Sequence, residues 1–242
     1  MARLTKSGTE RRPGPPPATD AADQSMRAGP LPPGLTLFIA VLAMSWGGPL
    51  VRFTDAPALV IGAWRVLLAV AVIWAVLVWR GEWRAALGLS RREWALAGAS
   101  GVMLAGHFWS WIASLEWTSV ASSVVLVSTQ PIFVALLSAV LLGEHASRRQ
   151  WAGIVLAVLG AGVIGWGDIG QGQDTVVGNA LALGGAVFAA GYFVIGRRLR
   201  QRLGLWPYTG VAYGVAGAAL ALAVVASPGA SLFGHTGQDW LV

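Results

Sequence analysis

Residues 107–144 read HFWSWIASLEWTSVASSVVLVSTQPIFVALLSAVLLGE. No charged side chain lies between Glu116 and Glu144, and the apolar run at 119–142 exceeds the about 20 residues that a helix needs to cross a bilayer. Because lipid offers the backbone no hydrogen bonds, a run of this kind is stable only as a helix or within a closed barrel. The alternating polarity of barrel strands is absent, so the stretch predicts a membrane-spanning helix.

Apolar runs of similar length continue through the chain from residue 34. The 242 residues are 55% hydrophobic and only 12% charged, whereas soluble domains carry about 25% charged residues. This excludes a soluble globular protein and a disordered one. The absence of cysteine from the sequence excludes disulfides, thiol chemistry and thiolate metal sites. We therefore predict an all-α membrane protein, a multi-span helical bundle. The seven predicted spans are residues 35–53, 57–79, 94–115, 119–142, 151–167, 176–196 and 207–226.

The connections between the predicted spans carry most of the charge, and they alternate in character. Fifteen of the 17 Lys and Arg residues lie in the amino-terminal segment and in every second connection, whereas the opposite side holds Arg52 and five acidic residues. The positive-inside rule then places the amino terminus in the cytoplasm and the protein in the cell (inner) membrane. The net charge of +6 is thereby explained as a topology signal, and we expect no binding to nucleic acid.

The chain also resembles itself after a shift of 146 residues. Trp94 then meets Trp240, and Trp46 meets Tyr192. Five predicted spans separate the two copies, so the second copy crosses the membrane in the opposite sense, which is the inverted repeat typical of secondary transporters. By this arithmetic, about 70 residues, roughly three spans, are expected to follow Val242 to complete the second copy.

Three segments follow from the repeat and the composition. Residues 1–33 hold seven of the 12 prolines and are predicted to form a disordered, Pro-rich cytoplasmic tail, with no apolar segment of the kind found in secretory signals. Residues 34–167 form the predicted first five-helix repeat, and residues 176–242 form a partial second repeat.

Arg65 is the only charged residue deep within a predicted span. A central arginine costs about 2.5–3.5 kcal/mol to insert into a membrane, so it is a functional candidate by default. The alternative is a structural arginine that bonds helix carbonyls or extends to the outer interface.

A polar and aromatic face is predicted on the third span. His107, Ser110, Trp111 and Ser114 recur at the spacing of one helical face. This pattern suits the wall of a substrate cavity. The alternative is a histidine bonded between helices, with the tryptophan facing lipid.

Two proline-containing segments predict weak points in the spans. Gln130 immediately precedes Pro131 in the fourth span, where proline removes a backbone donor and frees carbonyl groups. Gln130 is therefore a candidate ligand for a polar substrate. Trp46 precedes Gly47-Gly48-Pro49 in the first span, where the glycines are equally consistent with close helix packing.

Several enzyme chemistries lack the residues that they need. Gly98-Ala99-Ser100-Gly101 matches a rhomboid-protease pattern, but that chemistry requires a histidine on another span, and His107 lies on the same one. Catalytic metal sites need clustered histidines and carboxylates, and no carboxylate is central in a span. We expect no catalytic residue, no metal and no cofactor.

The sequence resembles the EamA family of the drug/metabolite transporter superfamily. The likeness is carried by Trp46-Gly47 with Arg65, by residues 107–144 with Pro131 and Leu-Gly-Glu144, and by RRQWAGIVLAVLGAGVIGW at 148–166. It implies a ten-span inverted-repeat fold, about seven spans of which are complete here, and the movement of small metabolites, often the export of amino acids or related compounds. Pro131 and Glu144 would then be structural residues, with Glu144 at the cytoplasmic end of the fourth span.

We therefore expect a secondary transporter that exports small metabolites by alternating access. Its expected partners are a small-molecule substrate and the lipid bilayer, and a homodimer is an open alternative to a monomer. Two other functions stay open: a non-transporting membrane fragment or accessory subunit, and an intramembrane hydrolase that uses Ser100. The expected substrate cavity is lined by Trp46, Arg65, His107, Trp111, Gln130 and Tyr192.

Overall fold

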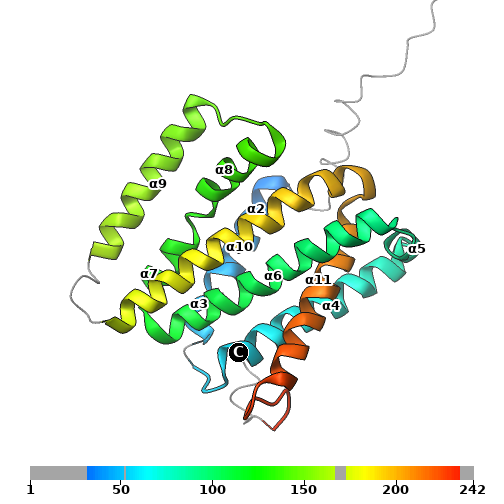
Figure 1. Ribbon diagram of the computed structural model, residues 1–242, viewed down its shortest axis with the longest axis horizontal. Helices are drawn as coiled ribbons and strands as arrows, with labels where there is room; N and C mark the ends of the chain where they lie inside the picture. The colour runs from blue at the N-terminus through cyan, green and yellow to red at the C-terminus, as the bar shows by residue number, and fades with distance from the viewer. Residues whose placement is uncertain (1–31, 52, 167–172, 235–242) are drawn as a thin grey trace, which may run out of the picture. The chain divides into compact units, whose positions relative to one another are not determined.

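All regular secondary structure in the described part of the chain is α-helical (Figure 1). The computed structural model describes residues 32–51, 53–166 and 173–234. This confirms the all-α prediction for these residues, whereas nearly all of the predicted tail and Arg52 lie outside them. The helices are α2 (Pro33–Ser45), α3 (Gly47–Val51), α4 (Ala58–Trp79), α5 (Trp83–Leu87), α6 (Arg91–Trp117), α7 (Val120–Val127), α8 (Gln130–Leu142), α9 (Arg148–Trp166), α10 (Gln173–Leu203) and α11 (Leu205–Ala226).

The chain divides into two compact units, residues 1–47 and 48–242. In the first unit, α2 is a helix of 13 residues that exposes large apolar side chains, including Leu37 and Phe38. An exposed apolar helix of this kind is suited to a lipid environment.

Five helical stretches in the described residues are long and apolar enough to cross a membrane, so the protein is a multi-pass membrane protein. They are Gly34–Val51, Ala58–Trp79, Val120–Leu142, Thr175–Leu203 and Leu205–Ala226, and they coincide with five of the seven predicted spans.

The other two predicted spans, 94–115 and 151–167, fall on α6 and α9. These segments are helical over 27 and 19 residues but are not among the five apolar stretches. For α6 the reason lies in its composition, because His107, three tryptophans and three serines dilute the apolar side chains of residues 94–115. At about 1.5 Å per residue its length still exceeds the thickness of the hydrocarbon core.

The fourth predicted span is interrupted next to Pro131. α7 ends at Val127, a turn follows at Ser128 and Thr129, and α8 begins at Gln130. The two hydroxyl groups of the turn donate hydrogen bonds to backbone carbonyls one turn back, at 2.6 Å in both cases. The weak point predicted from the proline is therefore a break between two helices.

Helix α6 occupies the middle of the second unit (Figure 1). It packs along α10 on one side and against α11 and α4 on the other. Small residues permit this close approach: a Cβ added at Gly101 of α6 would lie only 2.5 Å from the carbonyl oxygen of Ala212 in α11. Close backbone approach at small residues is a common basis of helix association in membranes.

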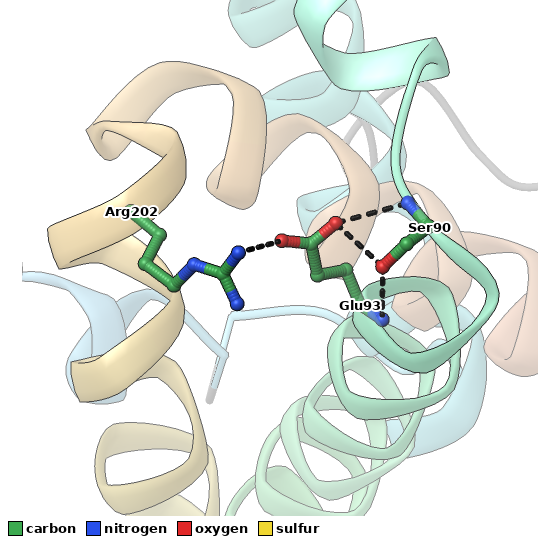
Figure 2. Close-up of polar contacts among 3 residues, drawn as sticks. All are labelled: Ser90, Glu93 and Arg202. Carbon is green, nitrogen blue, oxygen red and sulfur yellow. Dashed lines mark hydrogen bonds and ion pairs between the residues drawn. The ribbon is translucent and has the colours of Figure 1, made fainter.

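A capping box starts α6 and links it to α10 (Figure 2). Ser90 Oγ accepts a hydrogen bond from the Glu93 backbone N–H, and the Glu93 carboxylate accepts one from the Ser90 backbone N–H at 2.9 Å. Arg202, near the end of α10, lies 3.6 Å from the other carboxylate oxygen of Glu93. The hydrogen bonds from Ser90, followed by the charge of Arg202, lower the pKa of Glu93. The box satisfies two backbone donors at the helix start and joins two helices at the arginine-rich end of the bundle.

Candidate functional site

Arg65 of α4 lies beside the predicted aromatic face of α6. Its guanidinium carbon is 5.5 Å from the centroid of the Trp111 ring, within the range of a cation–π interaction. Trp111 is in turn stacked with His107, with ring centroids 6.3 Å apart and ring planes only 7° from parallel. The structure therefore brings three of the six predicted cavity residues together, between α4 and α6.

His107 also connects this group to α10. Its Nδ1 lies 2.9 Å from the carbonyl oxygen of Gly185, and because a carbonyl only accepts, Nδ1–H is the donor. A Cβ added at Gly185 would lie 3.2 Å from the Ser110 hydroxyl oxygen and 3.4 Å from the Cβ of Trp111. The glycine thus lets α10 approach the aromatic group closely enough to orient its histidine.

Trp111 contributes a buried hydrogen-bond donor that the protein does not use. Its Nε1 is inaccessible to solvent and has no hydrogen-bond partner among the described residues. Leaving such a donor unpaired costs about 1–3 kcal/mol. Both this N–H and the Arg65 guanidinium are donors of the kind that suits an anionic oxygen, such as that of a carboxylate.

The two serines of the predicted α6 face have packing roles. Ser110 donates to the carbonyl of Gly106 at 2.7 Å, and Ser114 lies 2.6 Å from the hydroxyl of Ser123 on α7. Both serines are buried. Their hydroxyl groups are hydrogen-bonded within the protein, so this part of the α6 face serves helix packing.

Gln130 and Pro131 lie elsewhere, in a cavity of about 770 Å³ between α8, α9 and α10. Glu144, which follows α8, forms an ion pair with Arg197 of α10 at one end of this cavity. The spacing of the α8 and α9 residues in its wall is that of one face on each helix. The wall includes Val134 and Ser138 of α8, Gln150, Ile154 and Ala157 of α9, and Phe193 of α10.

Tyr192 belongs to a third group, between α10 and α11. Its ring lies 6.1 Å from that of Tyr208 and 6.5 Å from that of Tyr213. Ser100 of α6 bonds the buried Tyr208 hydroxyl at 2.5 Å. The partner of Ser100 is thus a tyrosine rather than the histidine that hydrolase chemistry requires.

Trp46 follows α2 in the first unit and is 60% exposed. Three of the predicted cavity residues thus form one contact group, whereas Gln130 and Tyr192 each belong to a different group. That all six line a single cavity stays a prediction.

The pairing of Glu144 with Arg197 was not predicted from the sequence, and neither were the remaining residues of the cavity wall. The one available signal was the helical spacing of Gln150, Gly153, Ile154 and Ala157 on the fifth predicted span. In described residues, no group of three or more His, Cys, Asp or Glu side chains is suited to hold a metal ion.

Comparisons with known proteins agree with this fold. The family profile described as "EamA-like transporter family" matches residues 32–166, more than half of the chain. A solved structure described as "Crystal structure of protein" is similar with a TM-score of 0.61 and 23% sequence identity, over 85% of this chain and 68% of that chain. At this identity the likeness concerns the fold alone. No curated protein matches the chain.

Proposed function

Because the chain belongs to the EamA-like transporter family, we propose that it is a secondary transporter that exports small metabolites, such as amino acids or related compounds, by alternating access. The family match confirms the resemblance drawn from Trp46-Gly47 with Arg65 and from residues 107–144 and 148–166, and it identifies a membrane protein of a transporter family. The substrate class, the direction and the mechanism are our proposal. Members of such a family are typically transporters rather than enzymes.

The observation that carries this proposal is the contact of Arg65 with Trp111. A permanently charged guanidinium lies over an indole ring whose N–H is buried and unpaired. Both groups favour a negatively charged oxygen, and the neighbouring His107 and Phe108 rings add apolar contact area. A small carboxylate with an apolar side chain is the ligand class that this arrangement suits.

The other three predicted cavity residues and the inverted repeat are proposed to belong to the same carrier. Trp46, Gln130 and Tyr192 are proposed to meet the substrate in other states of the transport cycle. The proposed inverted repeat combines residues 34–167 with 176–242. It is supported by the internal similarity at a shift of 146 residues.

The proposed orientation follows from the arginines. Arg80, Arg148 and Arg202 belong to the end of the bundle that we assign to the cytoplasm of the inner membrane, as does the amino terminus. The concentration of positive charge in every second connection supports this assignment. A monomer and a homodimer are both compatible with it.

A metabolite-resistance screen of cells that express the chain would identify a substrate, and vesicles from these cells would test the site. We expect Arg65→Gln to lower the initial rate of transport on the order of 10–100-fold, the value of a hydrogen bond to a charged group. Arg65→Lys should retain part of the rate, because lysine keeps the charge but loses the planar donor geometry. Gln130→Leu should lower the rate as well.

The matched control is Arg198→Gln, which removes an exposed arginine at the end of α10. Membrane levels of every variant should equal those of the unsubstituted chain. Unchanged transport in both Arg65→Gln and Gln130→Leu would refute the site assignment. Absence of any solute flux through the unsubstituted chain would favour the alternative, a non-transporting membrane fragment or accessory subunit.

A further inference from the structure

The cavity between α8, α9 and α10 has the form of a groove that runs along the membrane-spanning helices. Its α8 wall extends from Gln130 to Ser138, a rise of about 12 Å, and its α9 wall from Gln150 to Ala157, a rise of about 10 Å. Along this length most of the wall is apolar. The groove therefore follows the helix axes, which is the direction in which lipid chains lie.

The apolar part of the groove is open to the outside of the helix bundle. Pro131, Gly153 and Ala157 in its wall are exposed, and Phe193 is 37% exposed. Pro131 and Phe193 belong to stretches apolar enough to cross a membrane. In a membrane-spanning bundle, such an opening faces the hydrocarbon chains of the bilayer rather than water.

One end of the groove is polar and carries excess positive charge. Arg197 and Glu144 lie there as an ion pair, together with His145 and Gln150. Arg198 follows Arg197 in sequence, and Arg148 and Arg149 begin α9 just before Gln150. Arg148, Arg149 and Arg198 thus lie within two positions in sequence of residues that line this polar end, and they add positive charge to a region where lipid headgroups meet the protein.

We propose that this groove binds one anionic phospholipid, with its phosphate at Arg197 and one acyl chain along α8 and α9. A guanidinium has five N–H donors, so Arg197 retains donors for phosphate oxygens while it contacts Glu144. Basic pockets between spanning helices are a recurrent setting for anionic headgroups. The proposal does not depend on transport, although Gln130 belongs both to the groove wall and to the proposed set of substrate contacts.

The charge of Glu144 distinguishes this binding role from a purely structural ion pair. If the pair serves only to hold α8 and α10 together, removing either partner has the same effect. If Arg197 binds a phosphate, then Glu144 opposes the lipid by repulsion and by occupying the guanidinium. Removing Glu144 should therefore strengthen lipid binding, whereas removing Arg197 should weaken it.

The test uses the full chain, purified and delipidated in detergent, and native mass spectrometry with equal amounts of dioleoyl phosphatidylglycerol and dioleoyl phosphatidylcholine. We expect one phosphatidylglycerol to be retained in preference to phosphatidylcholine. Arg197→Gln should weaken this binding about fivefold, and Glu144→Gln should strengthen it by a similar factor. Arg202→Gln lies further along the same helix and outside the groove wall. It is the matched control and should leave the binding of phosphatidylglycerol unchanged.

A second pair of variants tests the acyl-chain part of the groove. Ala157→Phe fills the groove and should lower the retention of both lipids, whereas Leu156→Phe, at a position that is 71% exposed and outside the wall, should not. Equal retention of the two lipids, parallel effects of Glu144→Gln and Arg197→Gln, or no effect of Ala157→Phe would each overturn the proposal. Complete displacement of the lipid by millimolar inorganic phosphate would also overturn it, because the site would then bind a free anion.

Discussion

The approach of α10 to the end of α6 can be tested at a single glycine. Gly178 of α10 is buried, and a Cβ added there would lie 2.7 Å from both the backbone nitrogen of Thr118 and the carbonyl carbon of Trp117. Both neighbours are backbone atoms, and the Thr118 N–H is bonded to the Ser114 carbonyl at 3.0 Å. Gly178→Ala therefore cannot be accommodated by a change of side-chain rotamer.

The expected cost is that of overpacking a tight contact, about 1–3 kcal/mol. The same helix supplies a matched control, because a Cβ added at Gly184 would meet no atom within 4 Å. In both variants alanine is more favourable than glycine in a helix interior by about 0.8–1.0 kcal/mol. This gain cancels in the comparison, so the difference between Gly178→Ala and Gly184→Ala isolates the steric clash.

Thermal unfolding of the purified chain in detergent, followed by tryptophan fluorescence, measures this difference. For a clash of about 2 kcal/mol, we expect Gly178→Ala to unfold about 4–8 °C below Gly184→Ala. Equal unfolding temperatures, or a lower one for Gly184→Ala, would refute the close approach of α10 to the end of α6.

Two other contacts of the helix bundle make testable predictions. The hydrogen bonds from Ser90 and the ion pair with Arg202 lower the pKa of Glu93 below its ordinary value of 4.5. These contacts therefore contribute their full stabilisation at pH values above 4.5, and the contribution is lost as the pH falls below that value. A thermal unfolding series from about pH 6 to about pH 3.5 should therefore show a loss of stability that is reduced in Glu93→Gln, and an identical pH profile in that variant would contradict the assignment. Tyr208→Phe removes the hydroxyl that bonds Ser100 within the buried region between α6 and α11, and should lower the free energy of unfolding by about 1–3 kcal/mol. SDS-induced unfolding checks this value, and a variant as stable as the unsubstituted chain would show that the bond contributes nothing.

Much of the fold could be predicted from composition, because bilayer thickness and backbone hydrogen bonding allow few alternatives for long apolar runs. Five of the seven predicted spans coincide with long apolar helices, and the proline at position 131 marked the break between α7 and α8. The span at 94–115 is less apolar than expected because the side chains that made α6 a functional candidate are polar or aromatic. The polar and aromatic residues of α6 thus supported the prediction of a functional site and lowered the apolar character of the predicted span at 94–115.

The candidate site was predictable only within single helices. Helical spacing placed His107 and Trp111 on one face of α6, and the cost of a buried charge singled out Arg65. The contact of Arg65 with Trp111 depends on the register between α4 and α6, which spacing along one helix does not contain. For the same reason, the pairing of Glu144 with Arg197, 53 positions apart, was not predicted.

The measurement that tests the proposed function most directly is solute flux through membrane vesicles that contain the chain. Vesicles with the unsubstituted chain, with Arg65→Gln and without the chain would receive a defined mixture of amino acids and related carboxylates, and their contents would be quantified by mass spectrometry over time. We predict that at least one anionic or zwitterionic solute crosses faster with the unsubstituted chain than with Arg65→Gln, whose rate approaches that of vesicles without the chain. Equal rates in the three preparations for every solute would contradict the proposal that this protein is a carrier with Arg65 at its substrate site.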